Sequence, residues 1–226
     1  MIDIDYFTGV IVGNEVDCLT ISFPFIITFF REVFMSLMIS VADVVHESIV
    51  DGVGVRAVLF GAGCSHACVG CHNPQSWDIN NGRQVALDYI FNELDIVANP
   101  LLRGVTFSGG DPMYQAEAFC ELAKMIRVVP SANYRRKGST MTVWCYTGYL
   151  FEDLISTHDA KYELLQNVDV LVDGRYVHEL RDFRLIYRGS RNQRFIDVQA
   201  SLKQGVAIDY YWDNYLDDGF YNWRMD

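Results

Sequence analysis

Residues 55–71 read VRAVLFGAGCSHACVGC, an apolar run that leads directly into three cysteines. The run is rich in Val, Leu and Phe, and the Gly-Ala-Gly sequence after it breaks the pattern, as in a strand that opens into a loop. Cys64, Cys68 and Cys71 then have the spacing C-x3-C-x2-C. This stretch predicts a loop with three closely spaced thiols at the carboxyl end of a strand.

The same order of strand, loop and helix continues along the chain. Helices are predicted at Gln84–Ala98, Tyr114–Val129 and from Leu150, where apolar residues have helical spacing. Strands are predicted at Val55–Phe60, Gly104–Ser108, Met141–Tyr146, Val168–Val172 and, as a short fifth, Arg194–Val198. This alternation is typical of an α/β fold with a mostly parallel sheet. We expect a partial β/α barrel, because four or five units cannot close an eight-stranded one.

Polar, glycine-bearing loops follow the first four predicted strands. They contain GAGC, SGGDP, CYTGY and VDGRY, in that order. Ligands of parallel α/β folds bind at the carboxyl ends of the strands. The edge where these four loops meet is therefore the candidate active site.

The two ends of the chain fall outside this pattern. We expect an N-terminal extension over residues 1–37, a core domain over 38–204 and an acidic, aromatic tail over 205–226. The apolar run Cys18–Phe30 is 13 residues long, and a spanning helix needs about 20. We therefore expect no membrane span. Three alternatives remain open for this region: an extra strand, a helix that covers the core, and a functional chain that begins near Met35 or Met38.

The composition limits the class of partner. The formal net charge is −11, from 18 basic and 29 acidic residues, and no basic run interleaves with aromatics. Nucleic acid is therefore not expected as a partner, since phosphate binding depends on a basic surface. Six cysteines are too few for a disulfide scaffold of this length, and three of them crowd into eight residues. This clustering favours a metal site in a reducing compartment.

Three thiols on one short loop suit an iron–sulfur cluster. Such clusters are usually held by four Cys thiolates. A set of three leaves one iron without a protein ligand, and an open position is what substrate-binding metal sites keep. A zinc site completed by His66 or His72, a disulfide and three unrelated core cysteines are the alternatives that spacing alone leaves open.

The segment Ser108–Pro112, SGGDP, follows the next predicted strand and so lies on the same edge. Paired glycines let a ligand approach the main chain, whose N–H and C=O groups can bind an amino acid. Alone, this segment would be better explained as an ordinary strand-to-helix turn. Its place one unit after the cysteines favours a shared site.

Taken together, these motifs resemble the radical S-adenosylmethionine (SAM) superfamily, in which C-x3-C-x2-C precedes a GGE or GGD segment. Within it, Met38–Leu202 looks like the activating enzymes of anaerobic (class III) ribonucleotide reductases. The matching segments are DGVGVR (51–56), GCHNPQSW (70–77), TFSGGDP (106–112), YTGY (146–149), VDVLVDGRYV (168–177) and YRGSRNQRFIDV (187–198).

The resemblance implies a cytoplasmic oxidoreductase with two cofactors, a [4Fe–4S] cluster and SAM. Cys64, Cys68 and Cys71 would ligate three irons, and the amino and carboxylate groups of SAM the fourth. One electron would cleave SAM into methionine and a 5′-deoxyadenosyl radical. That radical would take a Cα hydrogen from a glycine of the anaerobic ribonucleotide reductase large subunit. The implied electron donor is a low-potential protein such as flavodoxin or ferredoxin.

The resemblance also assigns residues to the binding of SAM. They are Gly70, Cys71, His72, Gly109, Gly110, Asp111, Thr147 and Asp173. The pair of glycines and the Asp after it match the segment that meets the methionyl amino group. Gly70 and His72 flank the third cysteine, where backbone groups approach the adenosine. Thr147 and Asp173 end later strands and either reach the ligand or merely cap those strands.

Other residues and other functions remain open at this stage. Cys120 and Cys145 are predicted to be core residues, because a buried free Cys behaves as a small hydrophobe. Arg188, Arg191 and Arg194 either clamp a carboxylate or the tail of the partner protein, or form a solvated face without function. The alternative functions are activation of another glycyl radical enzyme, radical chemistry on a small molecule of the 7-carboxy-7-deazaguanine synthase type, and a non-catalytic zinc-binding module.

Overall fold

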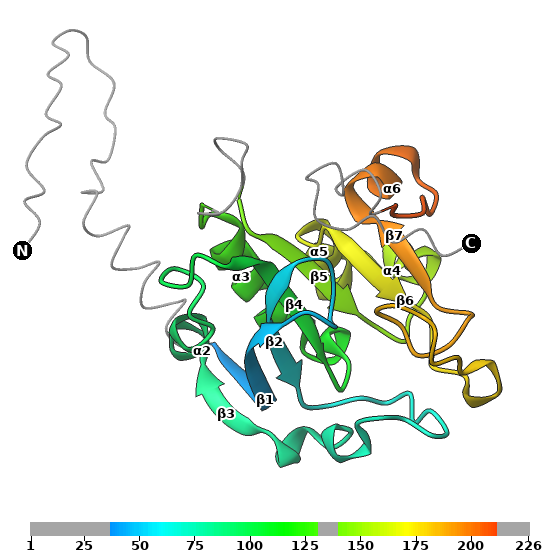
Figure 1. The fold of residues 1–226 in the computed structure, drawn as a ribbon, viewed down its shortest axis with the longest axis horizontal. Coiled ribbons are helices and arrows are strands. Elements are labelled where there is room, and N and C mark those ends of the chain that lie inside the picture. Colours follow the sequence, from blue (N-terminus) through cyan, green and yellow to red (C-terminus); the bar gives the residue numbers. More distant parts are fainter. Residues whose placement is uncertain (1–36, 131–139, 212–226) are drawn as a thin grey trace, which may run out of the picture.

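A seven-stranded sheet forms the centre of the computed structural model, which describes residues 37–130 and 140–211 (Figure 1). Its spatial order is β3-β1-β2-β4-β5-β6-β7. The strands are β1 (Met38–Ser48), β2 (Val55–Gly61), β3 (Arg83–Ala86), β4 (Leu102–Gly109), β5 (Thr142–Tyr146), β6 (Val170–Asp173) and β7 (Arg194–Asp197).

The four central strands are parallel and the outer ones are not. β2 pairs with β4, β4 with β5, and β5 with β6, all in parallel. β1 pairs antiparallel with both β2 and β3, and β7 antiparallel with β6. The prediction of an α/β fold with a parallel sheet is confirmed for this centre. Because β2, β4, β5 and β6 run the same way, the four predicted loops leave the sheet at one edge.

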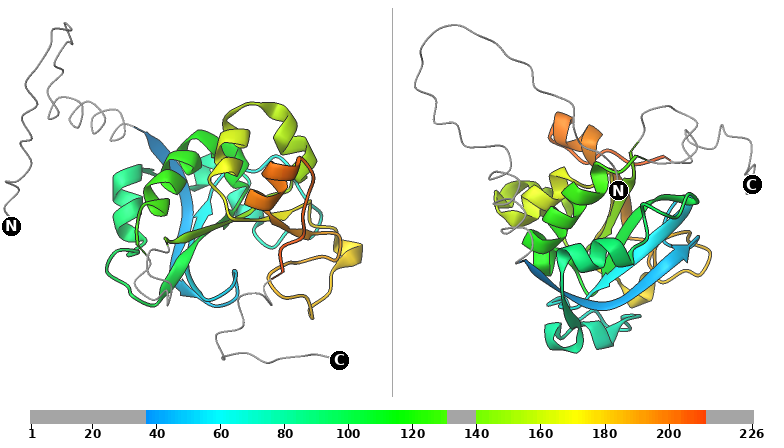
Figure 2. Two further views of the ribbon diagram at one scale, coloured as in Figure 1. Left: turned by 90° about the horizontal axis from the view of Figure 1, so that it is seen from above. Right: turned by 90° about the vertical axis from the view of Figure 1, so that its left-hand side faces the viewer.

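The helices gather on one face of the sheet. They are α2 (Leu87–Glu93), α3 (Ala116–Arg127), α4 (Phe151–Thr157), α5 (Ala160–Gln166) and α6 (Val198–Gln204). Short 3-10 turns are η1 (Pro74–Ser76), η2 (Ile79–Asn81), η3 (Pro112–Gln115) and η4 (His178–Leu180). Figure 2 shows α2, α3 and α5 side by side along this face, while loops cover the other.

Alternation along the strands divides the core in two, because successive side chains of a strand point to opposite faces. On the helix side, β5 contributes Val143 and Cys145 to the main core, which also holds Cys120 of α3. On the other side, Trp144 packs with a smaller group on β6 and β7. Cys120 and Cys145 are 1% and 0% exposed, so the prediction that they are core residues is confirmed.

The predicted helix Gln84–Ala98 is wrong at both ends. Residues 83–86 form β3, because their backbone groups pair with residues 38–41 of β1. α2 then ends at Glu93, and Asp95 adopts a left-handed conformation with φ +54° that ends the helical path. The apolar spacing was real, but strand pairing with a distant segment overrode it.

Several elements were not predicted, and some predictions fall outside the described residues. β1, α5 and α6 were missed. The predictions for residues 1–36 and for the tail beyond residue 211 lie outside the described ranges, as does the segment 131–139. Residues 205–211, the start of the predicted tail, return to β7, where Tyr210 N–H donates to Phe195 O (2.8 Å). In residues 37–130 and 140–211, no helix is long and apolar enough to cross a bilayer.

Candidate functional site

The loops after β2 and β4 are bonded to each other through their backbones. The Gly110 N–H donates to Gly61 O and the Asp111 N–H to Gly63 O, both at 2.8 Å. The loop after β2, residues 62–73, is called the cysteine loop below. Its start is bonded to the segment beyond it, since Cys64 N–H donates to Trp77 O (2.9 Å). The three cysteines and the SGGDP segment therefore lie at the same edge of the sheet.

This close approach requires the paired glycines. Gly109 has φ +101°, and a Cβ there would lie 2.5 Å from Gly61 O. A Cβ on Gly110 would lie 2.4 Å from Gly63 O. Both contacts are with backbone atoms, which cannot yield as a flexible side chain can. The glycines thus allow the two loops to come into contact. The predicted contact of Gly109 and Gly110 with a ligand stays a prediction.

The three thiols of the cysteine loop are all partly exposed and free. Cys71 N–H donates to Cys68 O (3.1 Å), and Ala67 and Gly70 adopt left-handed conformations, so the loop winds tightly. Burial raises the pKa of the Cys64 thiol, and the nearby Asp111, Cys68 and Cys71 raise it further, against a backbone hydrogen bond from His66 that lowers it. Cys68 and Cys71 are thus close enough to Cys64 to act on its charge.

The surroundings of the loop fit a bound group that accepts hydrogen bonds. His66 Nδ1, between Cys64 and Cys68 in sequence, and Trp77 Nε1, six residues after Cys71, are buried and find no hydrogen-bond partner among the described residues. Buried polar groups normally have partners, so such atoms need an explanation. The Trp77 indole N–H could donate to a sulfur atom of an iron–sulfur cluster, and the three thiols are the donor set that such a cluster takes.

A single-ion site is a different arrangement. In the part of the chain that the structure describes, no three His, Cys, Asp or Glu side chains converge closely enough to hold one metal ion. A four-iron cluster places each thiolate on its own iron, so its ligands stand further apart than those of one ion.

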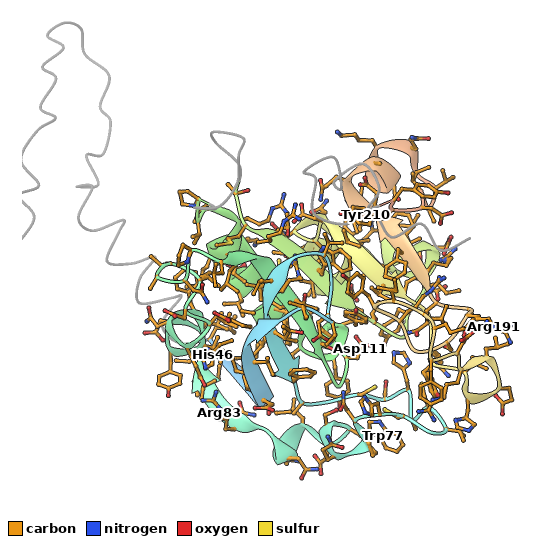
Figure 3. The ribbon with its side chains drawn as sticks, in the orientation of Figure 1. His46, Trp77, Arg83, Asp111, Arg191 and Tyr210 are labelled. Atoms are coloured by element: carbon orange, nitrogen blue, oxygen red, sulfur yellow. The ribbon has the colours of Figure 1, made fainter. Side chains whose placement is uncertain are left out.

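Asp111 lies at the centre of the site (Figure 3) and is 3% exposed. Its Oδ1 accepts the Met113 N–H (2.9 Å), which caps η3. Its Oδ2 accepts from Thr147 Oγ1 and from the Gly148 N–H, both at 3.0 Å, and lies 2.7 Å from His66 Nε2. The carboxylate thus joins the loops that follow β2, β4 and β5. Its predicted contact with the methionyl amino group stays a prediction.

His66 is a site residue that the sequence interpretation missed, since it was considered only as a zinc ligand. Its side chain is 5% exposed, and its ring meets Tyr149 edge-on at 4.8 Å. Gly148 leaves room for that ring, because a Cβ there would lie 2.4 Å from His66 Cδ2. The available signals were a histidine between two cysteines and a glycine in YTGY, but neither position alone predicts a contact with the other.

The remaining predicted residues have different surroundings. Thr147 is 6% exposed. Its hydroxyl donates to Asp111 Oδ2 and accepts the Tyr149 N–H (3.2 Å). Asp173 is fully buried, where Arg194 Nε (3.0 Å) and the Phe151 N–H (2.9 Å) donate to it. Both side chains therefore have partners within the chain, which fits the strand-capping alternative, and any reach to a ligand stays a prediction.

The residues around the third cysteine lie nearer the surface. His72 is exposed. Gly70 is exposed and packs under the ring of His178, since a Cβ on Gly70 would lie 2.5 Å from its Nδ1. The loop after β6 therefore contacts the cysteine loop.

Of the three arginines, Arg194 is bound by two carboxylates. Arg194 pairs with Asp173 and with Glu152 (2.7 Å), so it is not a free clamp. Arg188 donates to Gln193 O (2.7 Å), and Arg191 is exposed. For Arg188 and Arg191, both predicted alternatives remain open.

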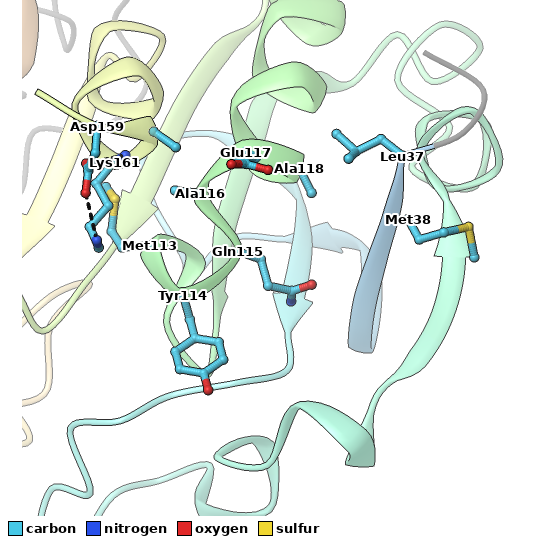
Figure 4. Close-up of a pocket in the computed structure, with 11 residues that line it drawn as sticks. Leu37, Met38, Met113, Tyr114, Gln115, Ala116, Glu117, Ala118, Asp159 and Lys161 are labelled. Carbon is cyan, nitrogen blue, oxygen red and sulfur yellow. Dashed lines mark hydrogen bonds and ion pairs between the residues drawn. The ribbon is translucent and has the colours of Figure 1, made fainter. Parts of the chain in front are cut away.

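A pocket of about 460 Å³ lies beside the SGGDP segment (Figure 4). It is bounded by η3, the first turns of α3 and α5, and the start of β1. Tyr114 connects it to the cysteine loop, because its ring packs against Gly63. The pocket itself is lined by none of the predicted site residues.

Comparison with known proteins identifies the family. Residues 50–196 match the model of the 4Fe-4S single cluster domain. The anaerobic ribonucleoside-triphosphate reductase-activating protein of Enterobacteria phage T4 is 35% identical over 145 residues, which cover 64% of this chain and 85% of the phage protein. The proteins of that name from Escherichia coli K12 and Vibrio cholerae are 34% and 36% identical over 148 residues, covering 64% of this chain and 90% and 89% of those proteins. With its three-cysteine loop at the carboxyl edge of a parallel sheet, the chain belongs to the family of anaerobic ribonucleoside-triphosphate reductase-activating proteins.

Proposed function

We propose that this chain is a radical SAM enzyme that generates a glycyl radical on the anaerobic ribonucleotide reductase. The observation that carries the proposal is the junction of the three-cysteine loop with the SGGDP loop. When bound, the cluster would supply the electron that cleaves SAM, and the adenosyl fragment would take hydrogen from the target glycine. The family's name and its 4Fe-4S domain support this reading.

In this proposal, Cys64, Cys68 and Cys71 hold the cluster as thiolates. Metal ligands must be deprotonated, and burial opposes the ionisation of Cys64, so binding of the iron would drive loss of its proton. The three thiols leave one iron free for the amino and carboxylate groups of SAM, as in other open metal sites.

The loops around the cluster would bind the rest of SAM. Gly109 and Gly110 offer backbone groups to the methionyl amino end, with Asp111 behind them. Gly70, Cys71 and His72 lie where the adenosine is expected, and the exposed position of His72 and Gly70 leaves that region accessible. Thr147 and Asp173 would act mainly by fixing the loops after β5 and β6.

The fold is proposed to be an incomplete β/α barrel of the radical SAM type. Four parallel strands with helices on one face support this assignment. Such a sheet presents all its carboxyl ends to one opening, where a large partner can reach a small bound cosubstrate.

The proposed partners are the reductase large subunit, which contains the glycine, and a low-potential electron donor such as flavodoxin or ferredoxin. We propose a cytoplasmic location, because partly exposed free thiols suit a reducing compartment. Each turnover would consume one electron and one SAM, and would release methionine and 5′-deoxyadenosine.

One mixing experiment tests the function. The full chain is reconstituted with iron and sulfide without oxygen, reduced, and mixed with SAM and the reductase subunit. We expect a glycyl radical signal in electron paramagnetic resonance that appears only with SAM, together with 5′-deoxyadenosine.

Two outcomes would overturn the proposal. Radical formation on another glycyl radical enzyme or turnover of a small molecule, with no signal from the reductase, would favour a different radical enzyme. Tightly bound zinc and no SAM cleavage would favour a non-catalytic module.

A further inference from the structure

His66 lies two residues from Cys64 and two from Cys68, but its side chain reaches across to a different loop. Its Nε2 is 2.7 Å from Asp111 Oδ2, and both side chains are almost completely buried, at 5% and 3% exposed. This bond connects the middle of the cysteine loop to the segment that follows β4.

The rest of the cysteine loop has few attachments. Its start is bonded to the Ser76–Trp77 segment and, through Gly63 O, to the Asp111 N–H, and the Cys71–Cys68 bond lies within the loop itself. Between residues 65 and 72, the His66–Asp111 contact is the one hydrogen bond that the described residues make to another part of the chain. The position of Cys68 and Cys71 relative to the SGGDP segment therefore depends strongly on this contact.

We propose that His66 and Asp111 form a latch that positions the cysteine loop, with His66 as a positioning residue for the thiols. The identity of the group that the thiols hold rests on the function proposed above, whereas the latch does not.

Three features make the latch specific rather than incidental. Asp111 is held in place by donors from Met113, Thr147 and Gly148, so His66 meets a fixed acceptor. A hydrogen bond to a carboxylate is strong, and burial strengthens it further. The imidazole ring is also confined: it meets the Tyr149 ring edge-on, and it packs against Gly148, which has no side chain to displace it.

Hydrogen exchange in the cluster-free full chain tests the latch directly. We compare wild type with His66→Leu, which removes the donor, and His66→Gln, whose amide nitrogen reaches about as far as Nε2. Amides of residues 64–72 are expected to exchange about tenfold faster in His66→Leu and within about twofold of wild type in His66→Gln. Amides of β5, which lie away from the loop, are the internal reference and should not change.

Either of two results would overturn the latch. Unchanged exchange in His66→Leu would mean that the bond does not hold the loop. Equally fast exchange in His66→Leu and His66→Gln would mean that the ring's packing, and not its hydrogen bond, is what matters.

A second measurement links the latch to the thiols. In the reconstituted protein, iron is expected to pass to a chelator about tenfold faster from His66→Leu than from wild type or His66→Gln. Equal release from all three would show that the latch does not position the ligands. If wild type itself takes up no cluster, the proposed function fails, while the exchange data still decide the latch.

Discussion

Two buried charges lie at opposite ends of the parallel sheet, and the chain holds them in different ways. At the amino ends of the strands, Arg56 is 1% exposed, and its guanidinium donates to Thr106 Oγ1 (2.7 Å), Val105 O (2.7 Å) and Thr142 O (2.9 Å). At the carboxyl ends, Asp111 takes its donors from loops. The first charge joins strands, and the second joins the cysteine loop to the loops after β4 and β5.

The partners of Arg56 are all neutral. Burial lowers the pKa of Arg56 to about 10, so the group still carries its charge at neutral pH. Its guanidinium also stacks on the Trp144 ring, 5.2 Å from the centroid. The comparison indicates that the amino end stabilises the fold, whereas the carboxyl end positions groups for function.

The largest expected effect is at a cysteine of the carboxyl end. Cys68→Ala should abolish iron binding and SAM cleavage, because two thiolates cannot hold the cluster that three do. Iron and sulfide analysis after anaerobic reconstitution measures this loss. Cys120→Ala is the matched control in the core and should retain the cluster. Equal loss in both variants would contradict the separation of ligand from core cysteines.

The second effect is on stability at the amino end. Arg56→Met should lower the free energy of unfolding by about 4 kcal/mol, because it leaves buried carbonyl and hydroxyl acceptors unpaired. Urea denaturation of the cluster-free protein measures this, and Arg175→Met, at an exposed site, should change it by less than about 0.5 kcal/mol. If folded Arg56→Met loses iron binding, the two ends are not separable in the way proposed.

A pair of glycines sharpens the same comparison. Gly104→Ala, at the amino end, places a Cβ 2.0 Å from Thr142 O and should cost about 3 kcal/mol, because a strand backbone must move. Gly148→Ala, at the carboxyl end, places a Cβ nearest to the His66 side chain, 2.4 Å from Cδ2, and should cost about 1.5 kcal/mol.

The readout that separates the two glycines is hydrogen exchange of the cysteine loop. Gly148→Ala should accelerate it, and Gly104→Ala should leave it unchanged once its global loss of stability is subtracted. The reverse pattern would mean that the loop is controlled from the amino end.

The smallest effect is expected at Thr147. Thr147→Val removes one of three donors to Asp111 Oδ2 and should lower the free energy of unfolding by about 1 kcal/mol. Thr157→Val is the control: it removes an exposed hydroxyl that donates to Leu154 O within its own helix and also contacts Asp159, and it should have a smaller effect. A loss at Thr147 no larger than at Thr157 would show that this donor contributes little to the site.

Much of the centre of the fold was predictable, because the parallel strands are apolar runs that end in glycine-bearing loops. Residues 83–86 were not, since their strand state depends on pairing with β1, far away in the sequence. The spacing of the cysteines singled out the three thiols, and their position after an apolar run predicted the edge of the sheet at which they lie. It did not give the His66–Asp111 contact, because two residues 45 positions apart carry no local signal for each other.

The shared acceptor at Asp111 has a consequence for protein engineering. Because one oxygen atom takes donors from the loops after β2 and β5 while belonging to the loop after β4, these three segments form one graftable unit. A chimaera that receives only the cysteine loop of a distant relative could lack a matching partner for the residue that takes the place of His66. Transfer of all three loops together, on an otherwise foreign sheet, would keep the unit intact.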